Sequence, residues 1–233
     1  SGWREFAVAS VILAIPGILI LKQPDLGTAL LVLGSGFFVI FFAGLSWKVI
    51  AWLTGLFLAS LPLFWTLMHD YQRQRVLTLL DPTQDPLGKG FHIIQSTVAV
   101  GSGGFTGKGF LQGTQTHLEF IPERTTDFIF AVLAEEFGLL GCLVLLTLYT
   151  CLIIRGLVIA GNAPTLFSRL MAGAMALIFF TYAFVNIGMV SGILPVVGVP
   201  LPLMSYGGTA MVTLGMGAGI LMSIQNTKKL IQT

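Results

Sequence analysis

The chain has 233 residues, of which 55% are apolar and only 9% are charged, and its net charge is +2. Soluble globular domains carry charges on about a quarter of their residues, so this composition excludes a water-soluble enzyme or binding module. The net charge is also too small to indicate a nucleic-acid partner.

Six continuous apolar segments follow one another along the chain. They cover residues 6–21, 28–44, 49–67, 128–154, 166–190 and 206–224. A helix needs about 20 apolar residues to cross the hydrocarbon layer of a membrane, and the first two segments are at the short end of that range. The runs do not alternate between apolar and polar residues, which excludes a transmembrane β-barrel. The sequence therefore predicts an all-α, polytopic helical membrane protein with about six transmembrane helices in one domain, residues 1–233.

The basic residues predict the orientation of these helices. If both termini lie on one side, that side carries Arg4, Lys48, Arg155, Arg169, Lys228 and Lys229. The short connections on the other side carry only Lys22. The positive-inside rule then places both termini in the cytoplasm and the long connection, residues 69–127, outside.

Residues 69–127 form a long polar stretch that holds most of the carboxylates of the chain. Within it, residues 91–100 predict a short amphipathic helix at the membrane surface, and the glycine-rich residues 101–109 predict an irregular loop. A loop of this length in a compact protein is either functional or disordered, and its aromatic and aliphatic residues favour packing. We therefore interpret residues 69–127 as an extracytoplasmic catalytic loop.

Residues 194–202 connect the last two predicted helices and are apolar, yet they contain three prolines. Proline removes a backbone donor and breaks helices, so this segment is not expected to form a regular helix. Two interpretations stay open. The segment is either re-entrant, packed against the other helices near a cavity, or a stiff turn.

Asp127 is the first candidate for chemistry. It follows Thr125 and Thr126 and lies at the outer mouth of the fourth predicted membrane helix. The positive end of a helix dipole favours a carboxylate there by about 0.3–1 kcal/mol. The alternative is structural, because Asp127 or Thr126 would also serve as the N-cap of this helix. The two roles are compatible, and both stay open.

Glu135 and Glu136 lie eight and nine residues after Asp127, roughly 12–13 Å along the same helix. A carboxylate inside a membrane helix is costly and marks a function or a specific partner. On a continuous helix, Glu135 points about 80° and Glu136 about 180° away from Asp127, so neither is expected to form an acid–base pair with it. We favour Glu136 as a buried structural hydrogen-bond acceptor.

The long loop also contains five basic residues: Arg73, Arg75, Lys89, Lys108 and Arg124. Arg binds phosphate through paired hydrogen bonds and Lys through a point charge, and the alternative is snorkelling to lipid headgroups. Lys108 is the stronger phosphate candidate, because its flanking glycines let backbone N–H groups approach an anion. The three histidines are too dispersed to predict a metal site.

Several motifs, spread over the whole chain, resemble in the same order those of one family. They are residues 23–28 (QPDLGT), 75–76 (RV), 85–88 (DPLG), 95–96 (QS), 101–104 (GSGG), 107–109 (GKG), 121–130 (IPERTTDFIF), 135–136 (EE) and 202–208 (PLMSYGG). The chain resembles the SEDS family (shape, elongation, division and sporulation). Residues 196–199 lack the lysine found near this position in the FtsW branch, which favours the RodA branch.

The resemblance implies a peptidoglycan glycosyltransferase of the bacterial inner membrane that polymerises lipid II, the undecaprenyl-pyrophosphate-linked disaccharide peptide. The implied partners are a class B penicillin-binding protein that cross-links the strands, other membrane proteins of the elongation complex, and membrane lipids. The family has ten transmembrane helices. The first four are therefore expected to be absent from this chain, which begins with Ser1 and resembles a fragment. We expect the isolated 233-residue chain to lack activity.

The resemblance implies that Asp127 is the essential carboxylate of the outer loop, with Glu119 in a supporting position. As general base, Asp127 would take the proton of the attacking sugar hydroxyl. The substrate-binding candidates are Arg73, Arg75, Gln95, Ser96, Lys108, Glu119, Glu123 and Arg124. Arg75 and Lys108 are expected to stabilise the departing pyrophosphate. No cofactor is required by the sequence, although a divalent cation, Mg²⁺ or Mn²⁺, would serve the same purpose.

Two other functions fit the same residues. A lipid II flippase would also need polytopic helices, prolines and buried carboxylates, and a scaffold would only recruit the cross-linking transpeptidase. A flippase needs polar residues along its whole path, and the helix interiors of this chain offer few apart from Glu135, Glu136 and Asn186. The polar outer loop therefore favours chemistry on the outer face.

Overall fold

The computed structural model describes residues 3–23, 26–68, 70–84, 89–114 and 125–231. Within these ranges the chain forms helices and no strand. The long helices are α1 (Trp3–Leu21), α2 (Leu26–Phe42), α3 (Trp47–Leu67), α7 (Ile129–Gly161), α8 (Leu166–Val190) and α9 (Gly208–Ile231). The outer loop contributes α4 (Asp70–Leu80), the 3-10 turn η1 (Pro82–Gln84) and α5 (Lys89–Ser102).

The six predicted apolar segments coincide with the six long helices, which confirms the all-α, polytopic fold. Five of these helices are long and apolar enough to cross a membrane, and α2, with 17 residues, is shorter. The fourth segment was predicted to end at residue 154, but α7 continues to Gly161. Arg155 interrupts the apolar run in the sequence without interrupting the helix.

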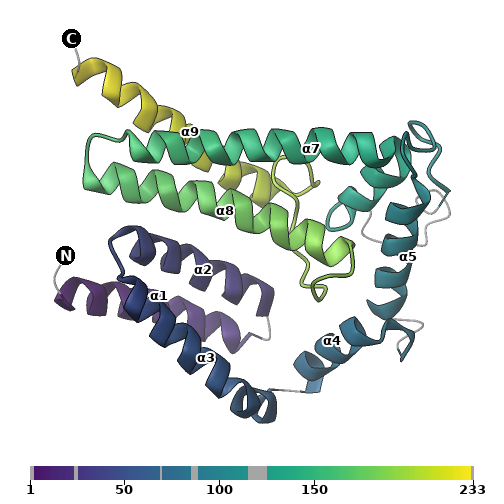
Figure 1. The fold of residues 1–233 in the computed structure, drawn as a ribbon, viewed down its shortest axis with the longest axis horizontal. Helices are drawn as coiled ribbons and strands as arrows, with labels where there is room; N and C mark the ends of the chain where they lie inside the picture. Colours follow the sequence, from purple (N-terminus) through teal and green to yellow (C-terminus); the bar gives the residue numbers. More distant parts are fainter. Residues whose placement is uncertain (1–2, 24–25, 69, 85–88, 115–124, 232–233) are drawn as a thin grey trace.

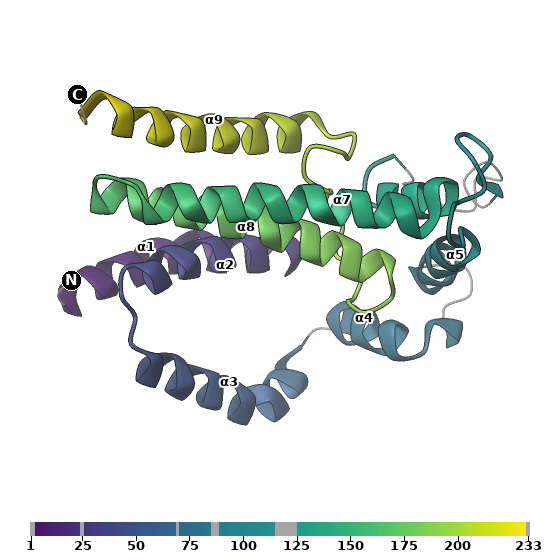
Figure 2. The ribbon, with the colours of Figure 1, turned by 45° about the horizontal axis from the view of Figure 1, so that its top comes forward.

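The helices α1, α2, α7 and α8 run side by side (Figures 1 and 2), and α9 packs on α8 and α7 at an angle (Figure 1). Small residues allow close packing between neighbours: a Cβ added at Gly156 of α7 would lie 2.8 Å from the Cβ of Ala176 on α8. Such approaches through small residues are typical of membrane helix pairs. The chain termini lie at one end of this bundle, and α4, α5 and the start of α7 lie at the other (Figure 1).

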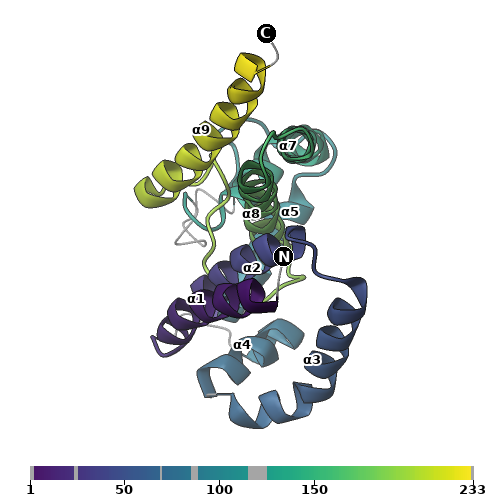
Figure 3. The ribbon, with the colours of Figure 1, turned by 90° about the vertical axis from the view of Figure 1, so that its left-hand side faces the viewer.

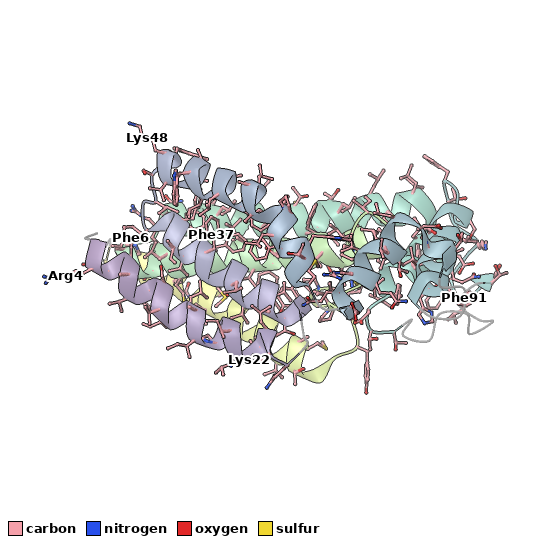
Figure 4. All side chains as sticks on the ribbon, turned by 90° about the horizontal axis from the view of Figure 1, so that it is seen from below. Arg4, Phe6, Lys22, Phe37, Lys48 and Phe91 are labelled. Atoms are coloured by element: carbon pink, nitrogen blue, oxygen red, sulfur yellow. The ribbon has the colours of Figure 1, made fainter. Side chains whose placement is uncertain are left out.

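The two ends also differ in their side chains. Arg4 and Lys48 lie at the end that holds the termini, whereas Phe91 lies at the opposite end (Figure 4). Arg4 of α1 and Lys48 of α3 therefore lie at the same end of the bundle, as the predicted orientation requires. Which end faces the cytoplasm stays a prediction.

Helix α3 lies apart from the rest of the bundle (Figures 2 and 3). None of its residues between Trp47 and Thr66 is buried. Its N-terminus is capped by Ser46, whose hydroxyl accepts the Val49 N–H at 3.4 Å. At its C-terminus, the Arg73 guanidinium donates to the carbonyls of Trp65 and Thr66 at 3.0 and 2.7 Å. Arg73 thereby fixes the corner between α3 and α4.

The predicted amphipathic helix at residues 91–100 is confirmed as α5, which is longer by two residues at each end. Its inner face buries Ile93, Ser96 and Ala99. Residues 194–202 form no helix, as expected, and Val199 and Leu201 are almost fully buried. This burial confirms that the segment packs against the other helices. That it is re-entrant stays a prediction.

Candidate active site

The four residues before α7 form a turn that is tied to the segment between α8 and α9. The Ser205 hydroxyl donates to the Thr126 carbonyl at 2.5 Å and accepts the Leu201 N–H at 2.7 Å. The Tyr206 N–H donates to the Thr125 carbonyl at 2.8 Å. Ser205 is itself buried. The backbone immediately before Asp127 is therefore fixed by residues nearly 80 positions later in the sequence.

Asn186, on α8, holds the backbone of Asp127 itself. Its side-chain amide donates to the Asp127 carbonyl at 2.8 Å and to the Val199 carbonyl at 2.6 Å. The Asn186 side chain is fully buried, and its Oδ1 atom has no hydrogen-bond partner in the part of the chain that the structure describes. One amide thus joins three segments: α8, the start of α7, and residues 194–206.

The Asp127 side chain is half-buried and faces Gly198. A Cβ added at Gly198 would lie 3.1 Å from Asp127 Oδ2, and Gly198 has a φ of +74°. The N-cap position of α7 is Phe128. Neither Asp127 nor Thr126 occupies that position, so the N-cap of this helix was predicted one or two residues too early. The residues just before the helix bond elsewhere: the Thr125 and Thr126 carbonyls accept from Tyr206 and Ser205, and the Asp127 carbonyl accepts from Asn186.

Gly198 also borders a cavity of about 240 Å³ between α2, α8 and α9. Its lining carries four hydroxyl groups: Thr28, Tyr182, Thr209 and Thr213. Gly198 therefore lies between the Asp127 carboxylate and a space with polar groups in its wall. Hydroxyl-rich ligands such as sugars are bound by this kind of lining.

Helix α7 is broken at Gly138, which has φ 62° and ψ −157°. The break separates residues 129–137 from the long remainder of the helix. Such a break leaves the backbone groups on its two sides without their usual partners four residues away. At this position a side chain would also collide with the Phe105 and Gly104 carbonyls, so the chain requires glycine.

The backbone of the glycine-rich loop fills this break with four hydrogen bonds. They join Leu139 N–H to Gly104 O (3.0 Å), Leu140 N–H to Phe105 O (3.2 Å), Lys108 N–H to Glu135 O (3.0 Å) and Gly109 N–H to Glu136 O (3.0 Å). A Cβ at Gly103 would collide with the Ala134 carbonyl, and one at Gly107 with the Glu136 carbonyl. The glycines of residues 103–109 thus allow one backbone to lie against another.

Glu135 and Lys108 form an ion pair where the loop enters the break. Lys108 Nζ lies 2.7 Å from Glu135 Oε1, and the Thr114 hydroxyl bonds to the ammonium at 2.8 Å and to the carboxylate at 3.1 Å. The Glu135 side chain is 0% exposed. Glu136 is also buried, as expected. The carboxylate seen accepting these hydrogen bonds, however, is that of Glu135, because the inserted loop places Lys108 and Thr114 beside it.

The other predicted site residues lie in different environments. Ser96 is fully buried, and its hydroxyl bonds to the Ile93 and Val190 carbonyls, both at 3.0 Å. It therefore ties α5 to the end of α8. Gln95 lies half-buried on the same helix. Their roles in substrate binding stay predictions.

Some of the predicted site residues fall outside the described residues: Glu119, Glu123 and Arg124. The side chain of Arg75 is not described either, although its backbone is part of α4. Within the described ranges, no three His, Cys, Asp or Glu side chains gather closely enough to hold a metal ion. The divalent cation stays a prediction.

Sequence reasoning missed Asn186, Ser205 and Gly138 as parts of the site. Asn186 had a signal that could have found it, because it is a lone amide in a long apolar run. Ser205 lay within a motif that carried the resemblance but was given no role. Gly138 has no signal in the sequence, since glycine occurs throughout membrane helices.

Comparison with known proteins identifies similar chains. The model of the FtsW/RodA/SpoVE family, described as cell cycle protein, matches residues 1–230. Peptidoglycan glycosyltransferase MrdB of Escherichia coli K12 is 61% identical over 98% of this chain. The chain spans 62% of the length of that relative.

Two solved structures share the fold. One is a chain in a peptidoglycan synthase complex that is described as coordinating polymerization and crosslinking. It has a TM-score of 0.77 and 38% sequence identity, and the match covers 96% of this chain and 62% of the length of that chain. The Rod shape determining protein RodA of Thermus thermophilus has a TM-score of 0.60 and 31% identity, with 95% of this chain and 57% of its own covered.

Proposed function

Because the chain belongs to the FtsW/RodA/SpoVE family, we propose that the protein is a peptidoglycan glycosyltransferase that polymerises lipid II at the outer face of the bacterial inner membrane. The E. coli relative carries the name of that activity. The helical fold, with five helices able to span a membrane, is that of a multi-pass membrane protein. Both termini of this chain would lie in the cytoplasm, and residues 69–127 outside.

The observation that supports this function most strongly is the way Asp127 is held. Its backbone carbonyl is fixed by Asn186, and the residues before it are fixed by Ser205 and the Tyr206 backbone. Its carboxylate faces Gly198, which borders the cavity between α2, α8 and α9. A half-buried carboxylate held by buried polar groups is the arrangement that a general base requires.

In the proposed reaction, a sugar 4-hydroxyl of one lipid II attacks the anomeric carbon of the growing strand. Asp127 accepts the hydroxyl proton as the new C–O bond forms, and the bond to the lipid pyrophosphate breaks. Positioned general bases contribute about 10²–10⁴-fold to such steps. A single direct displacement inverts the anomeric centre. The departing pyrophosphate is stabilised by basic residues of the outer loop, for which Arg75 is the candidate, or by a divalent cation.

The proposed partner is a class B penicillin-binding protein that cross-links the strands, within a complex of elongation proteins in the membrane. The similar chain in the synthase complex supports a cross-linking partner, since that complex is described as joining polymerization with crosslinking. Membrane lipids would surround the exposed apolar faces of the helices.

The experiment uses the full-length protein, purified with its transpeptidase partner and given fluorescent lipid II. We expect Asp127→Asn to lower the rate of polymer formation by about 10²-fold or more, as the loss of a general base does. Glu5→Gln is the control, because Glu5 is an exposed carboxylate in the first turn of α1, outside the outer loop. It should polymerise like wild type.

Equal polymer from wild type and Asp127→Asn would exclude Asp127 as the base. If neither forms polymer while wild-type vesicles translocate lipid II, the protein is a flippase. The size of each variant on a gel-filtration column in detergent reports whether it is folded, so that a loss of activity is attributable to the carboxylate.

A further inference from the structure

The ammonium of Lys108 is already paired inside the protein. It lies 2.7 Å from a carboxylate, Glu135, whose side chain is completely buried. An unpaired charge in such a place is strongly destabilising, because burial removes its hydration. Lys108 therefore compensates a charge of the protein itself. A pyrophosphate would have to compete with this carboxylate for the same ammonium.

The pair lies where two backbones are interlocked. Lys108 also donates its backbone N–H to the Glu135 carbonyl, so the two residues are joined through both backbone and side chain. Thr114 bonds to both charged groups and closes the pair on the loop side. The ion pair thus fastens residues 103–109 into the break of α7.

The short helix of residues 129–137 connects this ion pair to Asp127. At its start, Asn186 and Ser205 hold the chain. At its end, the inserted loop supplies the hydrogen bonds that the break at Gly138 removes. A rigid helical segment fixed at both ends sets the position of the carboxylate that precedes it, and release of either end lets that carboxylate move.

We propose that Lys108 and Glu135 are positioning residues for Asp127, and that Lys108 does not bind the pyrophosphate of the substrate. This inference rests on the proposed function, since it assigns a role in the same reaction. It also replaces the expectation from the sequence that Lys108 stabilises the leaving group. Gly107, beside Lys108, serves the contact with α7 rather than an anion.

The test measures kcat and KM for fluorescent lipid II with the full-length protein and its transpeptidase partner. We expect Lys108→Met and Glu135→Gln each to lower kcat, by on the order of 10²-fold for the misplacement of a reacting group by about 1 Å, with KM unchanged. Lys108→Arg keeps the ion pair and should retain most of the activity. Glu5→Gln, which alters an exposed carboxylate of α1 outside the outer loop, is the control.

The double variant Lys108→Met/Glu135→Gln separates positioning from substrate binding. It leaves no uncompensated buried charge, and replacing a whole buried pair is often tolerated, so its kcat should exceed that of Lys108→Met. If Lys108 bound pyrophosphate, Glu135→Gln would free the ammonium and lower KM, and Lys108→Met would raise it. That pattern, or wild-type kinetics from both single variants, overturns the proposal.

Two further comparisons cover the cases in which a variant does not accumulate or the proposed function itself fails. If a single variant does not accumulate, the double variant and Lys108→Arg carry the test, and a double variant with a raised KM contradicts the proposal. Asp127→Asn is measured in parallel. If Asp127→Asn polymerises normally, the proposed function has failed; if it is inactive while the Lys108 and Glu135 variants behave like wild type, only this inference has failed.

Discussion

Two regions of the molecule differ in how their polar side chains are bonded. The site end comprises residues 89–114, 125–140 and 186–206, and the α1–α3 region comprises residues 3–67. At the site end, buried Asn186 and Ser205 and the pair of Lys108 with Glu135 join segments far apart in sequence. In the α1–α3 region, the hydroxyls of Ser35, Ser60 and Thr66 bond to carbonyls three residues earlier in their own helices.

This difference follows from the lipid environment of the α1–α3 region and from the proposed role of the site end. Apolar helices in lipid satisfy their backbones internally, so they require no polar contacts with one another. A carboxylate that acts as a base must be fixed against several segments at once, because small displacements cost catalysis. The site end should therefore respond strongly to single changes, and the α1–α3 region weakly.

The largest effect is expected from glycine in the loop that enters α7. Gly107→Ala would place a Cβ against the Glu136 carbonyl at a φ of +81°. Overpacking costs about 1–3 kcal/mol and a left-handed non-glycine residue about 1–3 kcal/mol more. We expect a large drop in the unfolding temperature in detergent, and loss of activity.

Gly55→Ala on α3 is the matched control for Gly107→Ala, because nothing lies within 4 Å of its added Cβ. Helix propensity predicts a gain of about 1 kcal/mol or less. Equal unfolding temperatures for the two variants would show that residues 103–109 are not inserted in α7. The site end would then be no more sensitive to a single substitution than the α1–α3 region.

Asn186→Leu should have the next largest effect. It removes the donor that binds the Asp127 and Val199 carbonyls, and leaving buried polar groups unpaired costs about 1–3 kcal/mol. We expect kcat for polymer formation to fall more than the unfolding temperature alone would explain. Asn162→Leu is the control, since its amide donates to the Val158 carbonyl of its own helix. Similar losses from both variants would contradict a special role for Asn186.

The sequence is sufficient to predict the parts of the fold that depend on local composition. Each apolar run became a helix, residues 91–100 became an amphipathic helix, and the prolines of residues 194–202 excluded a helix there. These outcomes follow from hydrophobicity and from proline geometry. They need no knowledge of what each segment contacts.

The site required tertiary contacts that no local pattern contains. Gly107 and Lys108 looked like an anion-binding loop, because close backbone approach to a ligand and to another helix need the same residues. The break at Gly138 was hidden within an apolar run. The expected acceptor was Glu136, but Lys108 and Thr114 of the inserted loop lie beside Glu135 instead. The sequence predicted that Asp127 lies at the mouth of α7. It did not predict that Asn186 and Ser205 hold the backbone there.

The smallest effect is expected from Ser205→Ala, compared with the same change at Ser60. Ser205 bonds to the Thr126 carbonyl and to the Leu201 N–H, and a typical hydrogen bond contributes about 1 kcal/mol. Ser60 donates only to Phe57 within α3, where surface changes stay within about 0.5 kcal/mol. Because Thr126 precedes Asp127, Ser205→Ala should also lower kcat, while Ser60→Ala leaves it unchanged. If Ser205→Ala and Ser60→Ala have the same stability and the same kcat, the Tyr206 backbone and Asn186 are sufficient to hold the turn before α7. The site end then depends less on each single contact than its geometry indicates.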